Sequence, residues 1–427
     1  MDAGEMNPTG TGASVRTDTP VVRADTPVDV AIVGGGLVGA SLAVALAPLP
    51  LRVALIEAVA HDAPDQPSFD ERTTALSNAS RRIFETLNLW PQISASATPI
   101  ARIHVSDRGR FGFARIEAAR QNLPALGYVV PNRALGRALW SAIQAHAALQ
   151  VHVPAQVREV RRADDRVRIE IESGGARGGL SARLLVAADG AASRVREALG
   201  VEARVRDYHQ TALITTVLPQ QFHAHTAYER FTTQGPLALL PMSDGRCTAV
   251  LTLAAERVAE AMRWDDGAYL AELQSRFGFR LGRFLKCGPR VAYPLALTQA
   301  QATSTDRCIV MGNAAQTLHP VAGMGFNLGL RDAACLAELL AQRAGGDCGE
   351  ADLLRAYDDW RARDRRGVIG FTDSLVRTFS SPLAPLGLLR NAGLLAFDLL
   401  PPAKAALSRI ASGTARASRL ARGVPLA

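Results

Sequence analysis

The sequence has no run of 18 uncharged apolar residues, and this absence predicts that no helix of the chain spans a membrane. Its first 26 residues are rich in Thr, Ala and Gly and lack the apolar segment of a secretory signal. We therefore interpret residues 1–26 as a disordered extension and expect the protein in the cytoplasm.

Cysteine is scarce and scattered. The cysteines show neither a CxxC pair nor another metal-ligand spacing, and they lie at positions 247, 287, 308, 335 and 348. This pattern is typical of reduced thiols in a reducing compartment, and it predicts neither a metal site nor a disulfide framework. We expect Cys308 and Cys335, which lie in apolar stretches, to belong to the core.

Acidic residues are rare at the C-terminal end of the chain. The formal net charge is +8, and from Arg377 onward seven Lys or Arg residues are accompanied by a single acid, Asp398. No basic run alternates with aromatic residues in the way that follows a phosphate backbone, so we expect no nucleic-acid partner. The basic tail is either a solvated surface or a surface-binding segment.

A βαβ unit of a parallel sheet is predicted near the N-terminus. The sequence of Val28–Val33 is typical of a buried strand, that of Leu37–Leu46 of a helix and that of Arg52–Ile56 of the next strand. Residues 34–39 read GGGLVG and fit the G-x-G-x-x-G pattern, whose glycines allow a sharp turn, contact with a pyrophosphate and close helix packing. Glu57, after the second strand, is placed to accept hydrogen bonds from ribose hydroxyls. This motif alone does not distinguish FAD from NAD.

Two later motifs favour FAD. Residues 186–196 read VAADGAASRVR, with Asp189 at a strand end and Arg196 on the following turn. Residues 312–327 read GNAAQTLHPVAGMGFN and form a second strand–turn–helix segment that offers backbone N–H groups to an anion. Between about residues 206 and 294, β-branched alternation without such motifs predicts an inserted mixed sheet, and beyond Leu353 the chain is expected to be helical.

The three motifs, in this order and spacing, resemble the single-component flavoprotein aromatic hydroxylases of the p-hydroxybenzoate hydroxylase superfamily. The resemblance covers about residues 28–410 and is strongest to the ubiquinone-biosynthesis branch, in particular to the 2-polyprenyl-6-methoxyphenol hydroxylases. The phrases that carry it are FDERTTALS (69–77), GYVVPNRALGRAL (127–139), GNAAQTLHPVAGMGFNLGLRD (312–332) and LVRTFSSPLAPLGLLRNAGLLAFDLLP (375–401).

The resemblance implies an α/β fold. It consists of a Rossmann-like FAD-binding domain of the glutathione reductase type, an inserted mixed β-sheet substrate domain and a C-terminal helical segment. The FAD-binding domain is expected in three parts, at residues 27–90, 125–205 and 295–350. The substrate domain is expected at 91–124 and 206–294, and the helical region at 351–427.

The family's cofactor-binding residues carry over to matching positions. The resemblance assigns the ADP half of FAD to Gly34, Gly36, Gly39 and Glu57. Arg72 matches an arginine near the flavin and its phosphates, and Asn132, with Arg133 as its neighbour, lies where relatives contact the phosphates. Asp189 and Arg196 match a motif that contacts FAD and is implicated in pyridine-nucleotide use.

The third motif contains one departure from the family. Asn313 stands where most relatives carry an Asp that binds the ribityl hydroxyls; an amide can also accept and donate, so we interpret Asn313 as a marker of the branch, with loss of function as the competing interpretation. His319, beside Pro320, either shapes the site or assists phenol deprotonation, or else has a structural hydrogen-bonding role. Negative charge on the flavin ring is expected to meet backbone N–H groups of the segment that contains Gly323, Gly325, Phe326 and Asn327.

The function implied by the resemblance is that of an oxidoreductase using O2. It is an FAD-dependent monooxygenase that hydroxylates the aromatic ring of a polyprenylated phenol in ubiquinone biosynthesis, through a flavin C4a-hydroperoxide, with NAD(P)H as electron donor. Two alternatives stay open from the sequence. One is an FAD-dependent reductase of an isoprenoid chain, and the other is a flavin-bearing non-catalytic subunit of a biosynthetic complex.

The tail bears on how such a water-insoluble substrate is reached. Residues 383–422 combine many leucines with basic side chains, a composition suited to an anionic membrane interface. This composition predicts peripheral contact with the inner membrane surface, packing onto the flavin domain, or docking to other enzymes of the pathway. The sequence leaves these three interpretations open.

Overall fold

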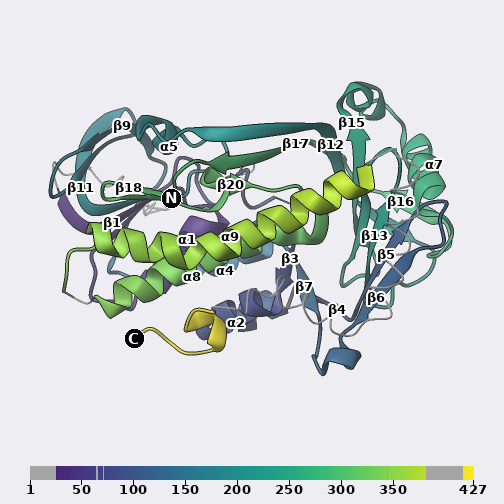
Figure 1. The fold of residues 1–427 in the computed structure, drawn as a ribbon, viewed down its shortest axis with the longest axis horizontal. Helices are drawn as coiled ribbons and strands as arrows, with labels where there is room; N and C mark the ends of the chain where they lie inside the picture. Colours follow the sequence, from purple (N-terminus) through teal and green to yellow (C-terminus); the bar gives the residue numbers. More distant parts are fainter. Residues whose placement is uncertain (1–25, 64–65, 71, 344, 381–416) are drawn as a thin grey trace, which may run out of the picture.

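The computed structural model describes residues 26–63, 66–70, 72–343, 345–380 and 417–427. Apart from Thr26, the predicted extension 1–26 lies outside these residues, and so does most of the tail 383–422. Two large sheets dominate the molecule, one at the left of Figure 1 and one that extends to its right end.

The first sheet contains the predicted βαβ unit. Five strands run parallel in the order β19-β11-β1-β2-β8, and β9, β10 and β18 extend the sheet by antiparallel pairing. These strands are β1 (Thr26–Val33), β2 (Val53–Ile56), β8 (Leu149–His152), β9 (Gln156–Arg162), β10 (Val167–Ser173), β11 (Ala176–Ala187), β18 (Ser304–Thr305) and β19 (Cys308–Val310). Val30 and Ile32 of β1 pack toward the helices, whereas Ala31 and Val33 pack toward β10 and β11. Burial on both faces explains the uninterrupted apolar sequence of β1.

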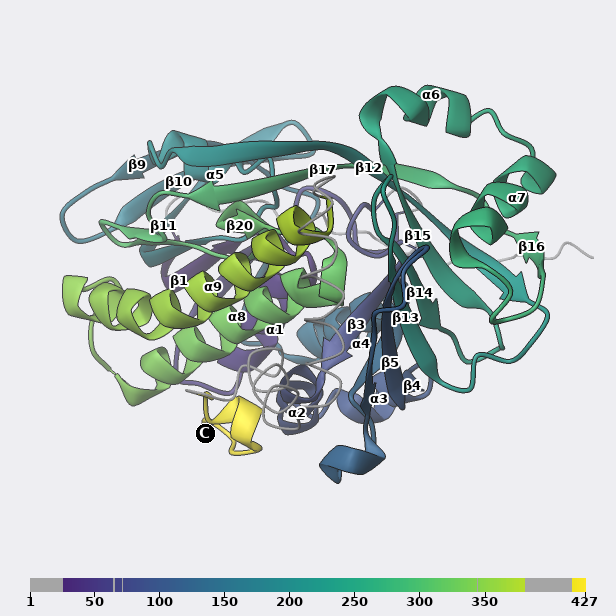
Figure 2. The same cartoon turned by 45° about the vertical axis from the view of Figure 1, so that its right-hand side comes forward.

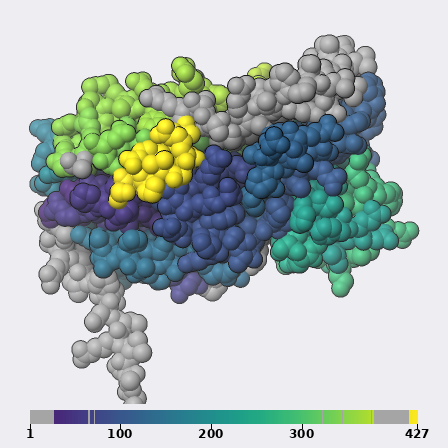
Figure 3. Space-filling view, turned by 90° about the horizontal axis from the view of Figure 1, so that it is seen from below, coloured from purple at the N-terminus to yellow at the C-terminus, as the bar shows by residue number. Residues whose placement is uncertain are grey.

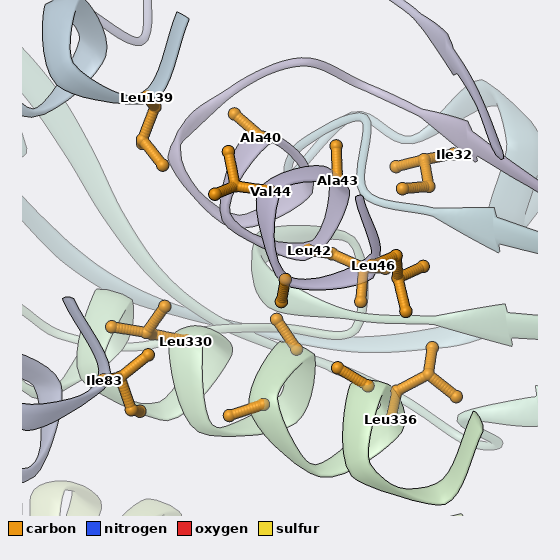
Figure 4. Packing of buried hydrophobic residues seen from close by; sticks show 14 of the residues in the cluster. Ile32, Ala40, Leu42, Ala43, Val44, Leu46, Ile83, Leu139, Leu330 and Leu336 are labelled. Atoms are coloured by element: carbon orange, nitrogen blue, oxygen red, sulfur yellow. The ribbon is translucent and has the colours of Figure 1, made fainter. Parts of the chain in front are cut away.

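Four helices cover the first sheet and one another. They are α1 (Leu37–Leu46), α4 (Asn132–Ala145), α8 (Met324–Gln342) and α9 (Ala351–Ser380). α1 contacts both α4 and α8, and all of its residues from Gly39 on are buried, so its sequence is apolar on every side. Figure 4 shows Leu42 and Leu46 of α1 directed toward α8. Cys308 and Cys335 are buried in this region, as the sequence predicts.

The second sheet has the order β20-β17-β12-β15-β14-β13-β5-β6, with β16 paired to β12. Its strands are β5 (Arg102–Asp107), β6 (Phe113–Glu117), β12 (Ala203–Pro219), β13 (Thr226–Phe231), β14 (Leu237–Pro241), β15 (Cys247–Ala254), β16 (Phe284–Cys287), β17 (Val291–Ala300) and β20 (Gln316–Thr317). The β5–β13 pair is parallel and the other pairs are antiparallel, so the sheet is mixed. β12 is long enough to run from the first sheet to the outer end of the molecule, where α6 (Val258–Ala261) and α7 (Asp266–Phe277) lie (Figure 2).

A small third sheet lies between the two large ones. It consists of β3 (Thr73–Ser77), β7 (Gly127–Pro131) and β4 (Thr98–Ile100), and α2 (Asn78–Thr86) and α3 (Trp90–Ser94) follow β3 in the chain. The C-terminal residues 417–427 return to this region and lie against α2 (Figure 3). The Thr86 hydroxyl donates to the Leu420 carbonyl at 3.0 Å, and Leu420 is buried. The last part of the chain therefore packs onto the protein.

The remaining short elements are α5 (Arg194–Ala198) and the 3-10 turns Ala119–Gln121, Ala255–Arg257, Gly312–Ala314, Val321–Gly323 and Leu420–Arg422. The predicted α/β class with a mixed second sheet is confirmed. None of the helices within the described residues has the length and apolar character needed to cross a bilayer.

Candidate active site

The turn after β1 is fixed by the protein's own backbone at two glycines. Gly34 has a φ of +103°, and a Cβ there would lie 2.4 Å from the Ala188 carbonyl oxygen. A Cβ on Gly39 would lie 1.9 Å from the Gly34 carbonyl oxygen. A Cβ on Gly36 would approach only the Ser68 side chain, with its hydroxyl at 2.9 Å. Gly36 is therefore the glycine of this turn whose surroundings leave room for a ligand.

Glu57 lies beside that turn, at the end of β2. Its carboxylate accepts hydrogen bonds from the backbone N–H of Gly35 and, at 2.9 Å, from that of Val59. Each carboxylate oxygen has a further lone pair, so these bonds orient Glu57 and leave acceptor capacity for a ribose hydroxyl.

The second motif is tied together by its own side chains. Asp189 follows β11 and accepts from the Ser193 hydroxyl at 2.5 Å and from the Val195 N–H at 3.2 Å. Ser193 caps α5 by accepting from the Arg196 N–H at 2.9 Å. The buried Arg196 guanidinium donates to the Ala314 carbonyl at 2.9 Å, which connects the second motif to the third. Asp189 and Arg196 thus shape the turn.

The arginine of the FDERTTALS segment belongs to a polar cluster that joins the sheets. The Arg72 Nε donates to Asp70 at 2.5 Å, and its guanidinium lies 4.4 Å from the centre of the Tyr293 ring. The Tyr293 hydroxyl donates to Asp70 at 3.1 Å. The buried Asn132 donates its backbone N–H to the Arg72 carbonyl at 2.8 Å and accepts from Thr74 at 2.7 Å. Arg133, in contrast, is exposed on the first turn of α4.

Sequence reasoning missed Asp70 and Tyr293. Asp70 lies two residues before Arg72 in the FDERTTALS segment, and this spacing could have predicted an ion pair between the two side chains. Tyr293 lies on β17, more than 200 positions away, and nothing in the local sequence marks it.

The third motif presents backbone and amide groups to open space. Asn313 is exposed, and within the described part of the chain its amide has no hydrogen-bond partner. Gly323 is left-handed, with a φ of +58°, and starts α8. A Cβ on Gly325 would meet no atom within 4 Å. The first N–H groups of a helix lack intrahelical partners, so the start of α8 offers donors to an anionic group there.

Asn327 fixes the start of α8 through its side chain. Its amide oxygen accepts from the Ser77 N–H at 2.8 Å and from the Ser80 hydroxyl at 2.6 Å. Its amide nitrogen donates to the Ala75 carbonyl at 2.7 Å and to the Gly323 carbonyl at 2.8 Å. All four hydrogen-bonding positions of the amide are used, and the Asn327 backbone N–H belongs to the first turn of α8, so Asn327 holds the helix start in place. The neighbouring Phe326 ring stacks with Phe84, with centroids 6.3 Å apart.

His319 is buried and neutral. Its Nδ1 accepts from the Val321 N–H at 3.2 Å, so the proton of the neutral ring is on Nε2. Burial lowers the pKa of His319 to about 4. The Tyr208 ring contacts it edge-on at 5.4 Å, and the Tyr208 hydroxyl donates to Asp373 at 3.3 Å. Burial, followed by the charge of Asp373, raises the pKa of Tyr208 to about 12, whereas Pro320 is exposed.

A buried charge network behind the third motif holds α8 against α9. Asp332 is fully buried and accepts from Arg361 at 2.6 Å and from Gln316 at 3.0 Å. Arg331 donates to Asp364 at 2.8 Å. Burial alone would raise the pKa of Asp364, but Arg331 and Arg361 beside it hold that pKa below its usual value. Sequence reasoning missed this network, although the adjacent Arg and Asp in an apolar helix were a signal for it.

The three motifs converge on one region. The Gly34 turn contacts Ala188 of the second motif, and a Cβ on Gly312 would lie 3.1 Å from Val38 of the first helix. Arg196 joins the second motif to the third. A profile described as an FAD binding domain matches residues 27–372.

The chain belongs to this FAD-binding family. This chain is 38% identical over 409 residues to ubiquinone hydroxylase UbiL of Rhodospirillum rubrum, and the match covers 94% of each chain. It is 32% identical over 379 residues to 3-demethoxyubiquinol 3-hydroxylase of Escherichia coli, covering 87% of this chain and 95% of that one. The predicted superfamily and its ubiquinone-biosynthesis branch are confirmed, as is FAD as the cofactor.

Solved structures support the fold of this FAD-binding protein. The p-nitrophenol 4-monooxygenase PnpA from Pseudomonas putida superposes with a TM-score of 0.74 at 18% identity, over 90% of this chain and 97% of that one. At this level of identity the likeness concerns the arrangement of sheets and helices.

Proposed function

We propose that the protein is an FAD-dependent monooxygenase that hydroxylates the aromatic ring of a polyprenylated phenol in ubiquinone biosynthesis. The observation that carries the proposal is the convergence of the three motifs around backbone donors with open space beside them. The relatives named ubiquinone hydroxylase match nearly the whole chain, which supports the same chemistry here. FAD supplies the oxygen chemistry when bound, with O2 as co-substrate and NAD(P)H as electron donor.

The ADP half of FAD is assigned to the first turn. Gly36 leaves room for the pyrophosphate, and Gly34 and Gly39 give the turn its shape. Glu57 accepts from the ribose hydroxyls, and Arg72, Asn132 and Arg133 lie on the phosphate side. Asp189 and Arg196 act by holding the second motif in place.

The flavin half is assigned to the third motif. Asn313 offers its free amide to the ribityl hydroxyls. The N–H groups of Gly325 and Phe326, at the positive end of α8, stabilise negative charge on the flavin ring, and the Asn327 side chain holds that end of the helix in place. The buried, neutral His319 shapes the adjacent Pro320 segment and keeps water away from the ring that reacts.

The two large sheets have different proposed roles. We assign cofactor binding to the first sheet with its helices, and positioning of the phenol to the second sheet, which contains β5, β6 and β12–β17. β12 begins at Ala203 and β17 ends at Ala300, so this sheet extends a few residues beyond both ends of the predicted segment 206–294.

Peripheral membrane contact or docking to pathway enzymes is assigned to the tail. Leu420–Arg422 pack against α2, so the proposal concerns residues 383–416, which lie outside the described residues. The triple variant Arg390→Gln, Lys404→Gln and Arg409→Gln is expected to weaken binding to anionic vesicles. Unchanged vesicle binding would leave the tail with a packing or protein-docking role.

The test of the proposed function is isotope incorporation. The FAD-loaded enzyme is supplied with NADH or NADPH, a polyprenylphenol and ¹⁸O-labelled O2, and the product is examined by mass spectrometry. We expect one labelled oxygen atom on the aromatic ring. A product with a saturated prenyl double bond and no label would instead identify an isoprenoid reductase. Bound FAD without any product would identify a non-catalytic subunit.

A further inference from the structure

The outer end of the second sheet exposes large apolar side chains. Phe279 is 71% exposed, Phe222 59% and Leu285 52%, in a chain in which aromatic residues make up only 5%. They lie in and around β16, at the end of the molecule farthest from the first sheet in both Figure 1 and Figure 2. Exposed apolar clusters of this kind mark a surface that contacts a partner or a membrane.

The backbone places these side chains on one edge. β16 pairs with β12, with Leu218 opposite Lys286. Beyond the end of β12, the N–H of Gln220 donates to the Arg283 carbonyl at 2.8 Å, and that of Gln221 to the Leu281 carbonyl at 2.9 Å. Phe222 follows directly, so it lies beside the segment 279–285. The three apolar side chains thus share an edge, although Phe222 is about 60 residues from the other two in sequence.

Cations alternate with these apolar side chains. Arg280, Arg283 and Lys286 are exposed, and within the described residues no carboxylate lies at ion-pair distance from any of them. Arg246, in the same domain, is by contrast paired with Asp244. We call Phe222, Phe279, Leu285, Arg280, Arg283 and Lys286 the outer-edge patch. Its three cations, which have no carboxylate partner within the described residues, favour an anionic partner. Its exposed phenylalanines and leucine favour a partner with an apolar interior.

We propose that the outer-edge patch docks the protein on an anionic lipid bilayer, with Phe222 and Phe279 among the headgroups and the three cations against lipid phosphates. An anionic bilayer combines the two properties that the patch selects. The proposal rests on the proposed function in one respect. The proposed substrate, a polyprenylated phenol, partitions into membranes, so an enzyme that acts on it has a reason to bind one. The patch shares no residue with the tail segment 383–416.

The experiment measures vesicle binding of the full-length, FAD-loaded protein by co-sedimentation. The vesicles consist of phosphatidylcholine alone or of phosphatidylcholine mixed with phosphatidylglycerol. We expect binding to the mixed vesicles that weakens as salt is added, because exposed charges are screened. At about 1 kcal/mol per cation near the surface, the triple variant Arg280→Gln, Arg283→Gln and Lys286→Gln should bind about 100-fold more weakly. Phe222→Ser with Phe279→Ser should bind about tenfold more weakly.

Matched controls lie elsewhere on the surface. The triple variant Arg204→Gln, Arg363→Gln and Arg366→Gln removes the same charge from exposed positions outside the patch. Val205→Ser removes a 66% exposed apolar side chain from the opposite end of β12. Both controls keep the tail, and we expect both to bind nearly as the wild type does.

Several outcomes would overturn the proposal. These are equal binding of patch variants and controls, equal binding of the wild type to both vesicle types, and loss of self-association without loss of vesicle binding in the phenylalanine variant. The last would make the patch an interface between copies of the chain. The assay requires neither substrate nor turnover, so its result is independent of the isotope experiment.

Discussion

The turn after β1 and the start of α8 both face the proposed flavin, but different parts of the chain build them. Gly34 and Gly39 are fixed by contacts with backbone atoms of the turn itself and of Ala188. The start of α8 instead depends on Asn327, whose amide binds groups 247 to 252 positions away in sequence. The first region is a local steric arrangement, whereas the second exists only after distant segments have come together.

The largest effect should come from the local turn. In Gly39→Val the new Cβ would lie 1.9 Å from the Gly34 carbonyl oxygen, so we expect a loss of more than about 4 kcal/mol in the free energy of unfolding. Gly36→Val is the matched variant, because its Cβ meets only the Ser68 side chain. It should keep its far-UV circular dichroism and lose most of its FAD. Full FAD occupancy in Gly36→Val would show that the pyrophosphate does not lie there.

Asn327→Ala tests the long-range region. Removal of the amide takes away four hydrogen bonds, including those to the Ser77 N–H and the Ala75 carbonyl, so we expect a loss of roughly 2–4 kcal/mol in urea unfolding. Asn313→Ala is the control, because that side chain is exposed and should change stability by less than about 0.5 kcal/mol. Similar losses in the two variants would contradict the role given to Asn327.

The buried His319 gives a pH dependence of stability. The pKa of His319 is about 4 in the folded protein, against 6.5 for a histidine exposed to water, so between those pH values the unfolded chain binds a proton that the folded one does not. Stability is therefore lost as the pH falls from above 6.5 to about 4, by on the order of 3 kcal/mol. His319→Gln should remove this part of the dependence in denaturant titrations at several pH values. Parallel curves for the two proteins would show that His319 titrates normally.

The smallest effect concerns the free amide of the third motif. Asn313→Leu should weaken FAD binding by about 1–3 kcal/mol, because ribityl hydroxyls lose a partner, while Asn313→Asp should be tolerated. The two dissociation constants are measured by fluorescence titration of the apoprotein with FAD. Equal affinity of the Leu variant and the wild type would place Asn313 outside the cofactor site.

The same contrast explains what the sequence predicts. The βαβ unit and the Gly34–Gly39 turn follow from residues that are close together in the chain, and in these the prediction agrees with the fold. Such motifs carry their own steric requirements, so they can be recognised without tertiary structure.

The side-chain clusters were not predictable in this way. Tyr293 reaches Asp70 from another sheet, and Asp332 meets Arg361 from another helix. These contacts depend on how α9 and β17 are placed, which no local pattern specifies. For Asn327 the motif predicted a place at a helix start, and only the fold shows that the side chain binds protein groups on all sides.

If the converging turns hold FAD, the purified protein contains flavin, and its flavin content can be measured. The protein is precipitated with acid, and the supernatant is analysed for FAD by chromatography and absorbance. We predict about one FAD released for each chain, because nothing in the motifs indicates a covalent link. Flavin that stays in the pellet would contradict non-covalent binding. A colourless protein that does not take up FAD on reconstitution would contradict FAD binding by these turns.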